Sequence, residues 1–261
     1  MPCRYEEANG VAILTLDRPE VLNAFDDDLG YETLDAVRRA SDDTSIRCIV
    51  ITGAGRAFSS GEDLGALQAD YDSGRPPPLG DTLTNRYNPL IRAIRAAPKP
   101  VLAAINGVAA GAGASIALAC DFRIASEKAK LVLAFVKVGL VPDSGGLWFL
   151  SRMVGTSRAW ELAATGEPLS AEEASTCGIV HRLVSPEEFD AAWRAWAEEL
   201  AAGPTLAYAL TKKLLNASTI MALDEQLDLE VDAQTEAGST ADHLEGVQAF
   251  LGKRRPEFKG L

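Results

Sequence analysis

The stretch that decides the fold is Asn106-Gly-Val-Ala-Ala-Gly-Ala-Gly-Ala-Ser-Ile-Ala-Leu-Ala-Cys-Asp121. It follows a short apolar strand expected over 101–105, and its small residues over 115–120 predict a tightly packed helix. Between them the backbone can turn sharply and leave peptide N–H groups open to a close neighbour, because the turn holds Gly107, Gly111 and Gly113. The first amides of a helix lack intrahelical acceptors and lie at the positive end of its dipole. The turn therefore suits an anion, or an oxygen that becomes negative during a reaction.

Other motifs with glycine turns fit this stretch less well. A P-loop needs a lysine after its last glycine, and none lies between Lys99 and Arg123. A dinucleotide-binding fingerprint needs a third glycine where Ile116 stands. The uncharged run 100–120 has the length of a membrane span, but it is rich in Ala and Gly and is interrupted by Asn106. We therefore interpret it as a buried strand, turn and helix, with tight packing alone as the alternative to an anion site.

Composition points to a soluble globular enzyme or binding protein. The 261 residues are 47% hydrophobic and 24% charged, with a net charge of −12, which argues against nucleic acid or an anionic membrane as partner. The first residues lack the apolar segment of a signal peptide, so a cytoplasmic protein is expected. The four cysteines and two histidines are scattered, which predicts neither disulfides, nor a metal site, nor a Ser-His triad.

The remaining elements divide the chain into two parts. Strands are expected over 11–17 and 47–53, helices over 26–40 and 84–97, and a loop over 70–81 that is either a solvated connection or a lid. Beyond residue 156 the sequence predicts helices, with 179–180 as the only strand. We expect an α/β core over 1–195 and a helical region over 196–261, whose helices cover 186–202, 205–217, 221–237 and 242–251.

Four segments together resemble the crotonase, or enoyl-CoA hydratase/isomerase, superfamily. The likeness runs nearly end to end and extends to 227–230 and 246–254 near the C-terminus. Any one segment carries little information, but four in this order and spacing are specific for the superfamily. The segments are Arg18-Pro-Glu-Val-Leu-Asn-Ala24, Arg56-Ala-Phe-Ser-Ser-Gly-Glu-Asp-Leu64, Asn106 to Asp121, and Gly139-Leu-Val-Pro-Asp-Ser-Gly-Gly146.

The resemblance implies a ClpP/crotonase-like superhelix of ββα units, whose C-terminal helices build a homotrimer or a hexamer of two trimers. It also implies an acyl-CoA thioester substrate, with its carbonyl oxygen between the backbone N–H groups of Glu62 and Ala112. Ala112 stands where the family usually has glycine, a change that keeps the donor. Arg56, with Phe250 and Lys253 from a neighbouring subunit, would contact the CoA nucleotide, although a solvated charge or ordinary helix packing is the alternative. The full set of implied binding residues is Ala24, Arg56, Gly61, Asp63, Leu64, Phe135, Phe250 and Lys253.

Departures from the family pattern concern the catalytic group. The hydratases resembled here hold a water between two glutamates, and those positions are Ser115 and Phe135 in this chain. Asp143 stands where hydratases usually have glycine, in a segment similar to the branch typified by 1,2-epoxyphenylacetyl-CoA isomerase of aerobic phenylacetate breakdown. In that branch the aspartate is the acid/base. The alternative is an aspartate that only bonds its own turn or caps the next helix. A raised pKa is expected from an apolar wall of Phe135, Leu140, Val141, Leu147 and Trp148.

The resemblance therefore predicts an acyl-CoA isomerase that moves a proton or double bond through an enolate, with Asp143 as acid/base. No metal or further cofactor is expected, because coenzyme A belongs to the substrate. The first alternative is a 2-enoyl-CoA hydratase, a lyase of fatty-acid or aromatic-acid degradation. The second is a non-catalytic CoA-binding or RNA-binding scaffold, although an acidic chain offers RNA little attraction. The acyl group stays open.

Overall fold

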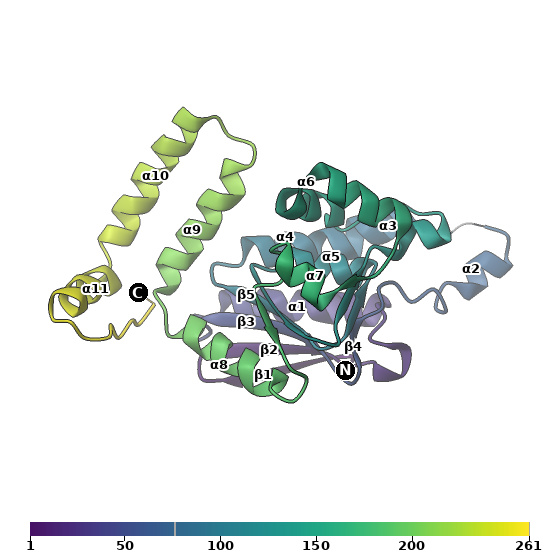
Figure 1. The fold of residues 1–261 in the computed structure, drawn as a ribbon, viewed down its shortest axis with the longest axis horizontal. Helices are drawn as coiled ribbons and strands as arrows, with labels where there is room; N and C mark the ends of the chain where they lie inside the picture. Colours follow the sequence, from purple (N-terminus) through teal and green to yellow (C-terminus); the bar gives the residue numbers. More distant parts are fainter. Residues whose placement is uncertain (76, 261) are drawn as a thin grey trace.

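The computed structural model describes residues 1–75 and 77–260 and places their strands in two sheets (Figure 1). The larger sheet has the order β1-β2-β3-β5-β7-β10 and is parallel except for β1. The smaller has the order β4-β6-β8-β9, with β9 antiparallel to β8. The strands are β1 (Cys3–Ala8), β2 (Val11–Leu16), β3 (Cys48–Gly53), β4 (Ala57–Ser59), β5 (Val101–Ile105), β6 (Val108–Ala110), β7 (Phe122–Ser126), β8 (Lys130–Val132), β9 (Leu169–Ser170) and β10 (Arg182–Val184).

The central strands of the larger sheet are buried on both faces, as their continuous apolar sequence requires. Because side chains alternate along a strand, Ile13 of β2 faces helix α8 (Phe189–Ala201), whereas Leu14 faces the opposite side of the sheet. Trp193 and Trp196 of α8 pack on the first face. The larger hydrophobic core lies on the opposite face of the sheet. Three helices contribute to it: α1 (Asp27–Asp42), α4 (Asn88–Ala96) and α5 (Ala112–Ala119).

The core contains further helical elements between and after these strands. They include a π-helix, η2 (Leu83–Tyr87), a feature often found at functional sites. The remainder are η1 (Pro19–Val21), α2 (Gln68–Asp72), α3 (Leu79–Thr82), η3 (Ala134–Val138), α6 (Gly146–Thr165) and α7 (Ala171–Thr176).

The last three helices extend away from both sheets as a C-terminal arm (Figure 1). They are α9 (Thr205–Ser218), α10 (Leu223–Gly238) and α11 (Ala241–Leu251), and they leave large apolar side chains such as Leu223, Val231 and Phe250 exposed. The expected division at 195/196 falls inside α8, which packs on the sheet on both sides of that point. We propose that the two parts separate after α8, at 202–204.

Most expected elements are confirmed, and four differences have physical reasons. Helix α5 begins at Ala112, three residues early, because Gly111 with φ 51° ends β6 and turns the chain into the helix. The expected loop 70–81 contains the end of α2 and most of α3, apart from residue 76, which lies outside the described residues. The strand expected at 179–180 is wrong, because both N–H groups donate to the Ala174 carbonyl and close α7. The real strands there are β9 and β10, and β1, β4 and β6 were not expected at all. Among the helices that the structure describes, none is long and apolar enough to cross a membrane.

Candidate active site

Two glycine turns meet at one edge of the smaller sheet. Strands β4 and β6 pair in parallel, so the chain leaves both at the same edge, through Gly61 and Gly111. Both glycines have positive φ, 94° and 51°. A Cβ atom on Gly61 would lie 2.9 Å from the Ala110 oxygen and 3.3 Å from the Ala112 nitrogen. Only glycine lets these two backbones approach so closely, and the approach brings the amides of Glu62 and Ala112 to one place.

Both of these amides are free to bind an added oxygen. Ala112 is the first residue of α5, so its N–H has no intrahelical acceptor. Within the described residues the Glu62 N–H also has no acceptor, whereas the next amide, that of Asp63, donates to the Phe25 oxygen at 2.9 Å. Two unpaired N–H groups on adjacent turns are the components of an oxyanion hole, which stabilises negative charge on a carbonyl oxygen.

A cavity of about 270 Å³ is lined by both residues. Its walls are mainly apolar and come from the segment after Gly61, from α3 and η2, and from η3 and the residues that follow it. Glu62, Tyr87 and Asp143 are the titratable side chains that line it. A mostly apolar cavity with a few convergent polar groups is the usual form of a small-molecule site. The apolar lining residues are Leu64, Leu79, Leu83, Ala134, Phe135, Val138, Leu140 and Val141.

Asp143 lies in a turn that its own backbone fixes. Its carbonyl oxygen accepts hydrogen bonds from Ser115 Oγ at 2.9 Å and from the Gly146 N–H at 2.8 Å. Its carboxylate accepts from Ser144 Oγ at 2.8 Å and makes no cap to α6, whose N-cap is Gly145. Burial raises the pKa of the Asp143 carboxyl above its usual range, the negative charge of Glu62 adds to that, and the Ser144 hydrogen bond opposes it. A carboxylate with a raised pKa is a better general base.

Several of the remaining predicted site residues lie in or beside the cavity. Phe135 and Leu64 line it, and Ala24 is buried nearby, where its carbonyl oxygen accepts a hydrogen bond from Arg18. The Asp63 carboxylate pairs with Arg18 at 3.0 Å and is therefore engaged in holding the loop.

The other predicted residues lie outside the cavity. Arg56 is exposed and does not line it. Phe250 and Lys253 lie on the exposed end of the C-terminal arm, far along the chain from the cavity (Figure 1). The expectation that Leu147 and Trp148 form part of the apolar wall is wrong, because neither lines the cavity. Trp148 lines a different cavity, and α3 and η2 contribute to this wall instead.

Sequence reasoning also missed a polar network beside the amides. The Glu62 carboxylate accepts hydrogen bonds from Arg86 Nη2 and from the Tyr87 hydroxyl. Arg86 and Tyr87 lie within a segment predicted only as a helix, and the π-helix that turns Leu83 and Tyr87 toward the cavity has no sequence signature. The available signal was that Arg86 and Tyr87 are neighbouring polar residues that do not belong to the apolar face of the predicted helix.

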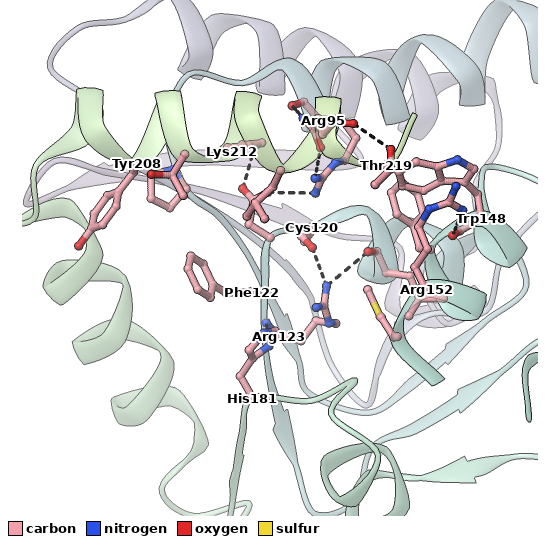
Figure 2. Close-up of a pocket in the computed structure, with 18 residues that line it drawn as sticks. Arg95, Cys120, Phe122, Arg123, Trp148, Arg152, His181, Tyr208, Lys212 and Thr219 are labelled. Carbon is pink, nitrogen blue, oxygen red and sulfur yellow. Dashed lines mark hydrogen bonds and ion pairs between the residues drawn. The ribbon is translucent and has the colours of Figure 1, made fainter. Parts of the chain in front are cut away.

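A larger cavity, of about 420 Å³, lies between α9 and the core (Figure 2). Its cationic side chains are already bound: Lys212 Nζ and Arg95 Nη1 both pair with Asp121, at 2.8 Å and 3.0 Å. Arg123 donates to the carbonyl oxygens at the end of α5 and to that of Ile179. The Lys212–Asp121 pair and the hydrogen bonds between Arg95 and Asn216 attach α9 to the core, so the cavity is the joint of the C-terminal arm and a weaker candidate for catalysis.

Comparison with known proteins shows which family the chain belongs to. A sequence model of the family described as enoyl-CoA hydratase/isomerase matches residues 6–261. The chain is 46% identical to 1,2-epoxyphenylacetyl-CoA isomerase of Escherichia coli K12, over 96% of this chain and 95% of that protein. It is 47% identical to a "Probable enoyl-CoA hydratase" of Rhodobacter capsulatus, over 98% and 97%.

A solved structure shows the same fold. The crystal structure of an enoyl-CoA hydratase from Bacillus anthracis superimposes with a TM-score of 0.92 at 32% identity, over 100% of each chain. Together with the sequence matches over nearly the whole chain, this shows the family as well as the fold. The chain belongs to the enoyl-CoA hydratase/isomerase, or crotonase, family.

Proposed function

We propose that this family member is an acyl-CoA isomerase, in which Asp143 moves one proton and no water is added. The thioester oxygen binds between the amides of Glu62 and Ala112, which makes a proton on the carbon next to the carbonyl more acidic. Asp143 accepts that proton as the C–H bond breaks, and the electron pair moves to the thioester oxygen as an enolate. Asp143 then returns the proton to another carbon, which shifts the double bond.

The observation that supports this proposal is that, of the two carboxylates that line the cavity among the described residues, Glu62 is paired with Arg86 and Asp143 makes no ion pair. Asp143 faces apolar walls and has a raised pKa because it is buried. No second base stands at the two positions where the hydratases have glutamates, which are Ser115 and Phe135 here. Ser115 donates a hydrogen bond to the Asp143 carbonyl oxygen, and Phe135 forms part of the apolar cavity wall. The similarity to 1,2-epoxyphenylacetyl-CoA isomerase points the same way.

We therefore expect crotonyl-CoA hydration to be slow beside isomerisation. The other carboxylate of the cavity, that of Glu62, is held by Arg86 and Tyr87, so Asp143 alone would have to orient and deprotonate a water. The measurement is the hydration rate of crotonyl-CoA alongside the isomerisation rate of a 3-enoyl-CoA, at equal enzyme concentration. Hydration at ordinary enzyme rates, about 1–10³ s⁻¹, would show the isomerase assignment to be wrong.

A hydratase is the second candidate, because the chain is equally similar to a probable enoyl-CoA hydratase. Asp143 would then have to activate water alone. The same assay separates the two candidates. A non-catalytic scaffold is a third, and it would show neither reaction while still binding the thioester.

We also propose that the enzyme is a trimer or a pair of trimers, in which the arm of one subunit completes the nucleotide site of another. The support is the apolar surface of α10 and α11 and the position of Lys253, which is exposed just after the end of α11.

Lys253→Ala should raise KM with little change in kcat, which is the pattern expected when an interaction made equally with substrate and transition state is lost. Lys128→Ala, an exposed lysine between β7 and β8, is the matched control. An unchanged KM in Lys253→Ala, or a monomer in sedimentation, would contradict this proposal.

A further inference from the structure

Glu62 brings a second carboxylate to the cavity, and the protein holds it from behind. Arg86 Nη2 donates to both of its oxygens, and the Tyr87 hydroxyl donates to Oε2. The Glu62 side chain is 20% exposed, whereas that of Arg86 is 3% exposed, so the carboxylate lies between the cavity and the buried guanidinium. Nothing in the resemblance to the family assigns a task to this side chain, since the oxyanion hole uses only the backbone of Glu62.

The packing of α1 is adapted to this ion pair. Arg86 Nη1 pairs with Asp27 at 2.9 Å, at the start of α1. A Cβ atom on Gly30 would lie 2.3 Å from Arg86 Cδ, so only glycine leaves room for the arginine there. Buried ion pairs contribute little net stability, because the desolvation of both charges offsets their attraction. A role in the reaction explains better why a charged pair stands in the wall of an otherwise apolar cavity.

The charge on Glu62 has one charged neighbour across the cavity. Glu62 and Asp143 are the charged side chains among the described residues that line it, and Tyr87 is the third titratable group. Burial and the adjacent Glu62 carboxylate raise the pKa of Tyr87, so its hydroxyl stays protonated and continues to donate. Behind the cavity wall, Arg86 pairs with Asp27, while Asp63, the residue after Glu62, pairs with Arg18, which also binds Asp26 at the start of α1.

We propose that Glu62 is a positioning residue through its side chain: Arg86 and Tyr87 hold its carboxylate as a fixed negative charge that makes Asp143 a stronger base. The inference rests on the proposed function, because it concerns the base of that reaction. Repulsion between the two carboxylates is relieved when Asp143 takes the substrate proton, so the fixed charge favours the proton transfer. Arg86 pairs with the Glu62 carboxylate on the side away from the cavity. This pairing limits how much the negative charge of Glu62 destabilises the negatively charged enolate.

The test compares the pH dependence of kcat/KM in three variants. The acid limb of this profile, the fall in kcat/KM at low pH, reports protonation of Asp143. Glu62→Gln keeps the shape and the backbone N–H but removes the charge, so the acid limb should move to lower pH. The plateau value of kcat/KM should fall by about 3- to 10-fold, a fraction of the worth of a general base. Ser144→Ala removes a hydrogen bond that favours the ionised Asp143, so its acid limb should move to higher pH. Asp27→Asn removes the charge of the other carboxylate that pairs with Arg86 but leaves the charge of Glu62 in the cavity. The acid limb of this variant should therefore stay in place.

A second variant covers the case in which Glu62→Gln leaves Arg86 buried without its main partner and fails to fold. Glu62→Gln/Arg86→Gln removes both charges and leaves no unpaired guanidinium, and it should show the same move to lower pH. The infrared carboxyl band that is lost in Asp143→Asn gives the titration of Asp143 without turnover. That band should titrate at lower pH in either Glu62 variant.

A role in folding alone makes a different prediction. The melting temperature would then fall in the Glu62 variants while the acid limb and the infrared titration of Asp143 stayed in place, and this result would overturn the inference. The proposed function fails separately: if Asp143→Asn keeps both activity and acid limb, Asp143 is not the base. If the limb disappears in Asp143→Asn but does not move in the Glu62 variants, only the present inference is wrong.

Discussion

Asp143→Asn should lower kcat for isomerisation of a 3-enoyl-CoA by about 10²–10⁴, the usual worth of a positioned general base. Asparagine has the size of aspartate and can still accept from Ser144, but it cannot take the substrate proton. The turn itself should survive, because Ser115 Oγ and the Gly146 N–H bind the backbone oxygen of residue 143. Thioester binding should also survive, since the amides of Glu62 and Ala112 are untouched.

The melting temperature is the control for this variant. Burial raises the pKa of Asp143, so the folded protein keeps this proton to higher pH than the unfolded chain does. The ionised carboxylate therefore costs stability, and the cost grows as pH rises from the ordinary carboxyl range through the raised pKa. Asp143→Asn should melt no lower than the wild type at neutral pH, with the difference vanishing in acid. A stable variant with a near-normal rate would mean that Asp143 is structural.

Ala112→Pro should lower kcat/KM by about 10²–10³, the loss expected when one donor is removed from an oxyanion hole. Ala112 is the first residue of α5, and proline is well accepted at that position because its missing N–H has no intrahelical acceptor. The substitution therefore keeps the helix, removes the donor and puts the ring Cδ where the amide hydrogen was, so the loss should be at least this large. The measurement is kcat/KM on the same 3-enoyl-CoA, with circular dichroism to confirm the helical content.

Ala112→Gly is the matched control, because it changes the same residue but keeps the N–H. It should retain activity within a few-fold, at a cost in stability of about 1 kcal/mol at most for glycine in a helix. Equal losses in both variants would show that the methyl group or the local packing matters and that the N–H does not. An active Ala112→Pro enzyme would place the thioester oxygen elsewhere.

The main architecture could be predicted because burial leaves a clear pattern in sequence. The strands around Ile13, Val50 and Ala103 are buried on both faces and therefore almost entirely apolar, with Thr15 and Thr52 as buried exceptions. Short strands with few residues lack such a pattern: β9 has two residues and β10 has three, and their pairing depends on distant partners. At 179–180 an apolar pair resembled a strand, but its burial comes from the end of α7.

The resemblance to the family could locate the amides of the site because its motifs keep glycines at fixed places. Gly61 and Gly111 are required by positive φ and by the contact between their turns, so they identify Glu62 and Ala112. The side chains around the cavity could not be located in the same way. Leu83 and Tyr87 reach it through a π-helix that depends on tertiary packing, and Leu79 reaches it from the start of α3. The pairing of Glu62 with Arg86 joins residues that are 24 positions apart with no motif between them.

The central claim is that Asp143 moves a proton of an acyl-CoA thioester and that no water is added. The most direct test is the mass of the product formed from one 3-enoyl-CoA in water labelled with a heavy oxygen isotope, for the wild type and for Asp143→Asn. We predict that the wild type forms a product with the mass of the substrate and a shifted double bond, without the label, and that Asp143→Asn forms almost none. A 3-hydroxyacyl-CoA carrying the label as the main product of the wild type would contradict the account.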